Sequence, residues 1–128
     1  MIYNEDTEEY KIKFYREIKT DRSPVLDYIE GLRDKEEAKV LKYIEFLRTQ
    51  KGYLGEPYSK HIKGTIRELR VDFGHNRHRV FYFIFVKKTI ILLHAFLKKT
   101  VKTPISEIKK AEENCQSVLR NPKIYEPR

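Results

Sequence analysis

The chain has 128 residues, a net charge of +8, seven phenylalanines, nine tyrosines, no tryptophan and a single cysteine. Its length suits one domain over residues 1–128, and 40% hydrophobic with 36% charged residues is typical of a soluble folded protein rather than a disordered one. The lone cysteine, Cys115, excludes an internal disulfide bond and a metal cluster built on thiolates, and we expect it to be buried.

The apolar run near residues 80–86 is too short to cross a bilayer, and the N-terminus lacks the regions of a signal peptide. We therefore expect a cytoplasmic protein with no membrane partner.

The first part of the chain predicts a strand followed by two helices. Residues 1–9 are polar and acidic, and we expect them to be flexible. Residues 10–18 alternate apolar and polar side chains, which is typical of a half-buried strand. A serine–proline pair begins a helix that ends at a glycine over residues 24–31, and a second helix follows over residues 34–52. Because the link between the two helices is short, we expect an antiparallel helical hairpin.

The second part predicts a loop, three strands and a last helix. Residues 52–64 hold three glycines and a proline, which favours a loop. The predicted strands cover residues 68–73, 77–86 and 89–97. The last two are apolar on both faces and are therefore predicted to be inner strands, with Phe81, Tyr82 and Phe83 packed in the core rather than stacked on bases. The final helix begins at Thr103-Pro104 and ends before residues 121–128, which we expect to be flexible.

These elements predict an α+β domain, in which the helical hairpin covers one face of an antiparallel sheet and a C-terminal helix completes the chain. We expect the other sheet face to be open and to gather charged side chains in a shallow basic groove.

Positive charge is concentrated in one part of the sequence. Residues 51–102 hold twelve lysines and arginines against three acidic residues, an excess of nine positive charges, whereas the rest of the chain has a net charge of −1. A nucleic acid is the expected partner, because neutralised phosphates release their counterions. A charged face that only keeps the protein in solution is the alternative.

Four of these cations are expected to converge at the ends of neighbouring strands: Arg70, Arg79, Lys98 and Lys99. Cleavage of RNA by its own 2′-hydroxyl needs a base, an acid and cations over the phosphate, and it requires no metal or cofactor. An arginine fork binds phosphate oxygens, and a lysine whose pKa is lowered by neighbouring cations can transfer a proton near neutral pH. The competing interpretation for the two arginines is an exposed strand position or an ion pair, and the main competitor is a pair of Arg70 with Glu68 or Asp72.

The four histidines divide into one site candidate and three structural residues. His61 lies among lysines in the glycine-rich segment and is an accessory site candidate. His94 lies inside an apolar strand and is expected to be hydrogen-bonded in the core, whereas His75 and His78 flank a turn and are expected to have local partners. The histidine spacings lack the i, i+4 pair of a zinc site, so no metal site is expected.

Three stretches resemble a known family: KGTIRELRVDF, HRVFYF and LLHAFLKKTVKTPISEIKKAEE. They are similar to the RelE/ParE superfamily of bacterial toxins, in particular its phage-derived HigB-like branch, over residues 10–119. The resemblance implies a RelE-like twisted antiparallel sheet backed by helices, and a toxin that cleaves mRNA in the ribosomal A site without metal. It also implies three partners: the ribosome, its mRNA and a cognate helix-turn-helix antitoxin that is HigA-like.

By position, Arg70 and Arg79 match basic strand residues of RelE-type nucleases, and Lys98 or Lys99 matches a basic residue near the scissile phosphate. Further RNA contacts are expected from Lys60, His61, Lys63, Arg67, Arg77 and Lys102. This chain has Glu68 where members closer to RelE have a lysine, and Tyr125 is its only late aromatic residue, so the general acid and base are not assigned. The alternative function is ParE-like inhibition of DNA gyrase, or nucleic-acid binding without catalysis.

Overall fold

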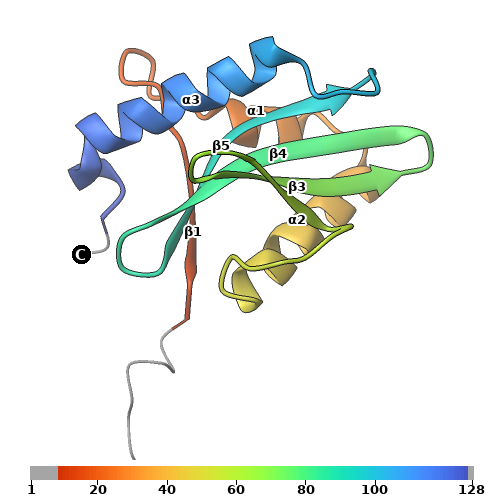
Figure 1. Cartoon of the computed structure of the whole chain (residues 1–128), viewed down its shortest axis with the longest axis horizontal. Coiled ribbons are helices and arrows are strands. Elements are labelled where there is room, and N and C mark those ends of the chain that lie inside the picture. Colours follow the sequence, from red (N-terminus) through yellow and green to blue (C-terminus); the bar gives the residue numbers. More distant parts are fainter. Residues whose placement is uncertain (1–8, 127–128) are drawn as a thin grey trace, which may run out of the picture.

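The structure is a computed structural model that describes residues 9–126, and it confirms an α+β fold (Figure 1). Its elements in chain order are β1 (Lys11–Phe14), α1 (Pro24–Glu30), α2 (Asp34–Thr49), β2 (Ser59–Lys63), β3 (Ile66–Phe73), β4 (Asn76–Phe85), β5 (Thr89–Lys98), α3 (Ile105–Arg120) and the short 3₁₀ helix η2 (Pro122–Ile124). Among these described residues, no helix has the length and apolar character that crossing a membrane requires.

The five strands form one mixed sheet in the order β1-β5-β4-β3-β2. β1 runs parallel to β5, and the other neighbours are antiparallel, so the prediction of a wholly antiparallel sheet is wrong at this edge. The central places of β4 and β5 confirm that they are inner strands. β2 lies inside residues 52–64, where a loop was predicted. The prediction missed this strand because its five residues, two of them lysines, lack the apolar alternation of a half-buried strand.

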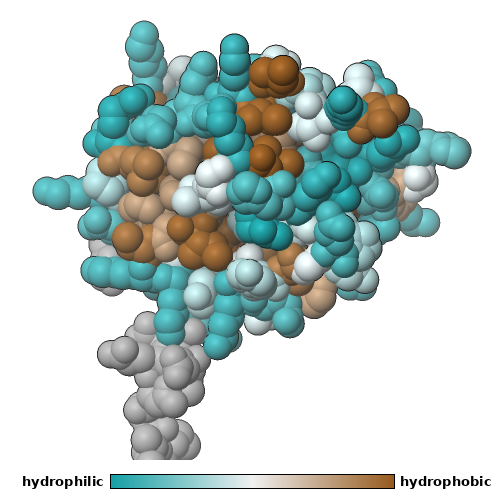
Figure 2. Space-filling view, viewed as in Figure 1, coloured by the Kyte–Doolittle hydropathy of each residue, from teal (hydrophilic) through white to brown (hydrophobic). Residues whose placement is uncertain are grey.

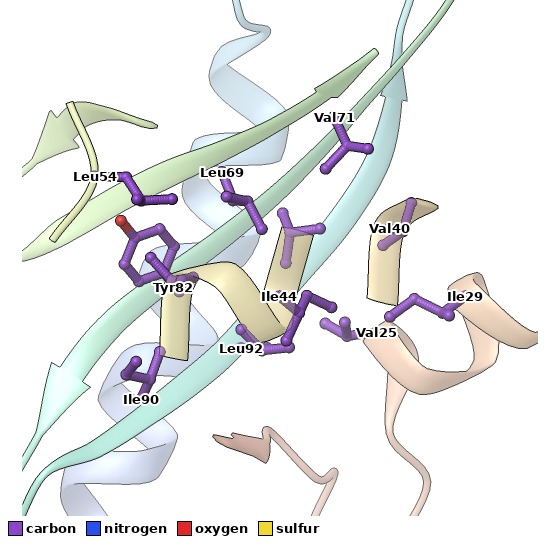
Figure 3. Packing of buried hydrophobic residues seen from close by; sticks show 12 residues of the cluster. Val25, Ile29, Val40, Ile44, Leu54, Leu69, Val71, Tyr82, Ile90 and Leu92 are labelled. Carbon is purple, nitrogen blue, oxygen red and sulfur yellow. The ribbon is translucent and has the colours of Figure 1, made fainter. Parts of the chain in front are cut away.

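One sheet face packs against α1 and α2, as the close-up in Figure 3 shows. Val25 and Ile29 of α1 and Val40, Ile44 and Leu47 of α2 lie in one buried cluster with residues of β3, β4 and β5. α1 begins at Ser23, whose hydroxyl accepts a hydrogen bond from the amide of Leu26 at 3.3 Å. The two predicted helices therefore exist, and both cover the same face.

The other sheet face packs against α3, so the prediction that it is open is wrong. Phe81 and Phe83 of β4 share a buried cluster with Ala111, Cys115 and Val118 of α3. An inner strand that is apolar on both sides has to be covered on both sides, and the C-terminal helix supplies the second cover. The buried state of Cys115 and the core packing of Phe81, Tyr82 and Phe83 are confirmed.

The chain after α3 packs on the molecule as well. Tyr125 is buried, and its hydroxyl accepts a hydrogen bond from the backbone amide of Arg16 at 2.9 Å. This differs from the flexible end expected for residues 121–128, of which the structure describes 121–126. The flexible start expected for residues 1–9 lies, except for Glu9, outside the described residues.

Candidate active site

Four cations from three strands lie on the sheet face that carries α3, beyond the start of that helix. They are Arg70 of β3, Arg77 and Arg79 of β4, and Lys98 of β5, and we call them the cationic cluster. The strand register places Arg70 opposite Arg79, and Arg77 opposite Lys98. Side chains alternate between the two faces along a strand, so these four lie on the same face of the sheet. Their sequence neighbours, such as Val71 and Val80, lie on the opposite face, in the core under α1 and α2. In Figure 2 hydrophilic side chains dominate the side of the view where the β3–β4 turn and the end of β5 lie.

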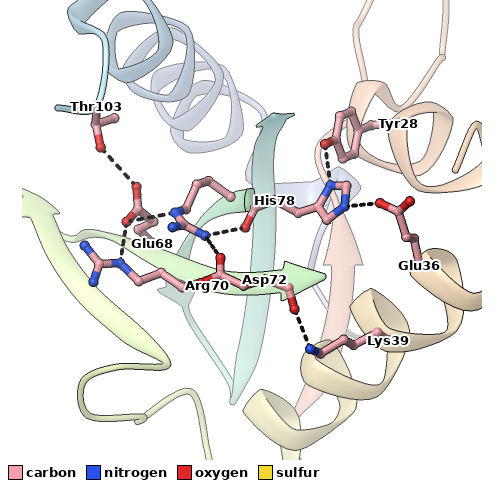
Figure 4. Close-up of polar contacts among 9 residues, drawn as sticks. Tyr28, Glu36, Lys39, Glu68, Arg70, Asp72, His78 and Thr103 are labelled. Atoms are coloured by element: carbon pink, nitrogen blue, oxygen red, sulfur yellow. Dashed lines mark hydrogen bonds and ion pairs between the residues drawn. The ribbon is translucent and has the colours of Figure 1, made fainter. Parts of the chain in front are cut away.

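A buried carboxylate, Glu68, lies beneath the cationic cluster and is fully shielded from solvent. It accepts a hydrogen bond from Arg70 Nε at 3.0 Å and one from Thr103 Oγ1 at 3.3 Å, and its Oε1 is 3.9 Å from Arg79 Nε (Figure 4). One carboxylate therefore orients two guanidinium groups and fixes the loop that leads into α3. A buried carboxylate is tolerated only where such partners surround it.

Arg79 is the most buried member of the cluster, with 6% of its side chain exposed. Its Nη1 donates to Asp72 Oδ1 at 2.8 Å and to the carbonyl of His78 at 3.0 Å, and its Nε is buried without a hydrogen-bond partner among the described residues. By contrast, 25% of the Arg70 side chain is exposed. The ion pairs considered as the competing interpretation are thus confirmed for both arginines. They leave an excess of two positive charges, because Glu68 and Asp72 face four cations.

The amine of Lys98 is the member of the cluster whose charge can change most readily. Partial burial lowers the pKa of Lys98, the nearby guanidinium groups of Arg79, Arg70 and Arg77 lower it further, and the carboxylate of Glu68 acts in the opposite direction. A lysine with a lowered pKa can give or take a proton closer to neutral pH than an ordinary lysine can. The three arginines serve as fixed cations.

The other predicted site residues divide between the two faces. Lys60 lies opposite Glu68 in the β2–β3 register and is exposed, so it extends the cationic cluster toward the β2 edge. Lys99 and Lys102 follow β5 and are exposed, and Lys63 forms an ion pair with Glu112 of α3 at 3.1 Å.

Arg67 and His61 do not join the cluster, because they lie opposite each other on the sheet face that packs against α1 and α2. Arg67 Nε donates to Ser59 Oγ at 3.2 Å, and His61 Nε2 is 2.8 Å from the carbonyl of Gly64. A one-residue offset along a strand reverses the face, which the charge count of the sequence does not take into account.

His78 has long-range partners, so the prediction of local partners is wrong for this residue. Its ring is buried, with Nδ1 2.7 Å from Tyr28 Oη and Nε2 2.6 Å from Glu36 Oε2 (Figure 4). Asn76 Nδ2 also donates to Glu36, at 3.1 Å. Burial, with a contribution from the Glu36 charge, raises the pKa of Tyr28 to about 12. The alternation that puts His78 on the same face as Val80 was the available signal for its burial.

The last two histidines lie in different settings. His94 Nε2 is 2.5 Å from Glu107 Oε2 of α3, so its expected hydrogen bond is confirmed, and His75 lies in the turn between β3 and β4. Within residues 9–126 no three side chains of His, Cys, Asp or Glu come together in a way that could hold a metal ion.

The sequence of the chain matches the model of a known protein family. The model of the family described as phage derived protein Gp49-like (DUF891) matches residues 27–116, which are 90 of the 128 residues and include the whole cationic cluster, Glu68 and Thr103. This family is a RelE-like toxin family of toxin–antitoxin systems. The chain is a member of the phage-derived Gp49-like family. No curated protein matches it.

Proposed function

We propose that this protein is a toxin that cleaves mRNA on the translating ribosome, by attack of the RNA 2′-hydroxyl on the neighbouring phosphate. The observation that carries the proposal is the cationic cluster, in which three arginines and one lysine of lowered pKa converge from β3, β4 and β5. Membership of a toxin family supports the same conclusion.

Each member of the cluster has a part in this reaction. The partly exposed fork of Arg70, together with Arg77, binds the oxygens of the scissile phosphate, and Arg79 adds positive charge from below. The 2′-oxygen forms a bond to phosphorus, the bond from phosphorus to the 5′-oxygen breaks, and the phosphate carries extra negative charge between these events. The 2′-hydroxyl loses one proton and the leaving 5′-oxygen gains one, so the charge balances. Lys98 transfers one of these two protons, because it is the cluster member that can change its charge. The products are a 2′,3′-cyclic phosphate and a 5′-hydroxyl.

The biological partners follow from the same proposal. The mRNA is presented by the ribosome, whose A site exposes a single strand to the cluster. A cognate helix-turn-helix antitoxin neutralises the toxin, as in the HigB-like branch that the sequence resembles. The excess of positive charge in residues 51–102 supports a polyanionic partner.

The test is to express the protein in bacteria and to map new mRNA 5′ ends across all transcripts. Wild type is expected to give cuts inside translated codons, and Arg70→Ala and Lys98→Met are expected to lose them. Lys11→Met removes an exposed lysine from β1, at the opposite edge of the sheet, and should cut like wild type. Growth arrest with intact mRNA and DNA damage would contradict the proposal and favour gyrase inhibition.

A further inference from the structure

An exposed aromatic surface lies outside the candidate active site, on α2 and the loop after it. It consists of the exposed rings of Phe46, Tyr53 and Tyr58 together with the half-buried ring of Tyr43. Tyr53 is 78% exposed, Tyr58 42% and Phe46 38%, whereas every other Phe and Tyr within residues 9–126 is at least half-buried. The Tyr58 ring meets Phe46 and Tyr43 edge-on, with ring centroids 5.8 Å and 6.1 Å apart. Exposed rings gathered in this way mark a binding surface more often than single exposed apolar residues do.

Positive charges lie directly beside these rings. Lys39 Nζ is 5.6 Å from the centre of the Tyr43 ring, and the Arg67 guanidinium carbon is 5.8 Å from the centre of the Tyr53 ring. Lys42 is exposed on α2, four residues before Phe46 and so on the same side of the helix. The nearby acid of α2, Glu45, is already hydrogen-bonded to Arg48. Rings that can stack on bases, with cations that can bind phosphates between them, form the arrangement of a single-strand binding surface.

The aromatic surface and the cationic cluster meet at one strand edge. The carbonyl of Tyr58 accepts a hydrogen bond from the amide of Arg70 at 2.9 Å, and pairing between β2 and β3 begins one residue later on β2. From Val71 onward, the edge of β3 is therefore not paired with β2. There Lys39 of α2 donates to the carbonyl of Asp72, while the carboxylate of the same Asp72 binds Arg79 on the other face (Figure 4).

We infer that the aromatic surface binds the bases of a single RNA strand that continues from the cationic cluster around the edge of β3. This inference extends the proposed function and rests on it, because the proposed function is the reason for taking RNA as the ligand. Stacking on the rings is tolerant of base sequence, so the surface holds the strand without selecting it. The cations beside the rings favour RNA, whose phosphates repeat along the strand, over an uncharged protein surface.

The test measures binding of a fluorescent 2′-O-methyl RNA strand, which the 2′-hydroxyl reaction cannot cleave. Tyr53→Leu and Tyr58→Leu keep an apolar side chain but remove the ring, and each is expected to weaken binding about fivefold or more, the low end for a base stacked on an aromatic side chain. Their salt dependence should match wild type, whereas Lys42→Ala should reduce the slope of log affinity against log salt by roughly 0.7. Leu41→Ala alters a 44% exposed apolar residue of the same helix and should bind like wild type.

Wild-type affinity in both tyrosine variants, or an equal loss in Leu41→Ala, would overturn the inference. A concentration-dependent dimer that dissociates in the tyrosine variants, with RNA affinity unchanged, would also overturn it and assign the surface to a protein contact. Crosslinking in cells distinguishes messenger from ribosomal RNA as the source of the strand. Weakened binding in the tyrosine variants, in a protein that cuts no mRNA, would refute the proposed nuclease and retain the surface.

Discussion

Among single residues, Glu68 determines the geometry of the candidate active site. A carboxylate among cations weakens their attraction for phosphate, so its presence has to be explained by what it positions. It binds Arg70 at 3.0 Å and Thr103 at 3.3 Å, and it has no exposed surface. Glu68 thus places an anion beneath the cluster, and this anion fixes the direction in which Arg70 points.

Glu68→Gln should disturb both folding and proton transfer. Breaking a buried charged pair costs roughly 3–5 kcal/mol, which urea unfolding measures. Because the Glu68 charge opposes the lowering of the Lys98 pKa, its removal should lower that pKa further and move the Lys98 limb of the pH–rate profile to lower pH. Glu112→Gln in the surface pair with Lys63 is the matched control and should cost less than about 1 kcal/mol. A stable Glu68→Gln variant with an unchanged pH profile would show that the carboxylate positions nothing.

Among the strands, β4 connects the two faces of the sheet. Arg79 faces the cationic cluster, and its neighbour His78 faces α1 and α2, where it binds Tyr28 and Glu36. The backbone carbonyl of His78 also accepts from Arg79 Nη1 at 3.0 Å. The strand that carries the deepest cation is therefore held in place from the opposite side by two helices.

Stability at low pH should depend on Glu36. Its hydrogen bond with His78, helped by Asn76, lowers the pKa of Glu36 below the ordinary value of 4.5. The carboxylate therefore stabilises the fold above pH 4.5, and this contribution is lost as the pH falls through the lowered pKa. Glu36→Gln should be less stable at neutral pH and should lose stability less steeply below pH 4.5, as measured by urea midpoints. A Glu37→Gln variant of the same helix should keep the steep decline, and an equally steep decline in Glu36→Gln would refute this assignment.

Across the full chain, local sequence patterns predicted the helices and the inner strands. They did not predict that α3 packs on the sheet face opposite α1 and α2. The serine–proline start of α1 and the apolar runs of β4 and β5 carry their own signals, since capping and alternation are local. The parallel place of β1 and the lysine-rich edge strand β2 depend on pairing with distant residues. For the site, the predicted meander of strands brought Arg70 close to Arg79, and the register places the two residues opposite each other. Grouping Arg67 and His61 with them by charge alone ignored which face each residue occupies.

The most direct measurement uses purified ribosomes, a short mRNA, and the same mRNA with one 2′-deoxy nucleotide at the mapped cut. The protein should cut the first to give a 2′,3′-cyclic phosphate and leave the second intact. Lys98→Met should cut about a hundredfold or more slowly, the low end for loss of a proton-transferring group, and Lys11→Met should cut normally. Full-rate cleavage of the deoxy template, or of the first template by Lys98→Met, would contradict the reaction proposed for the cationic cluster.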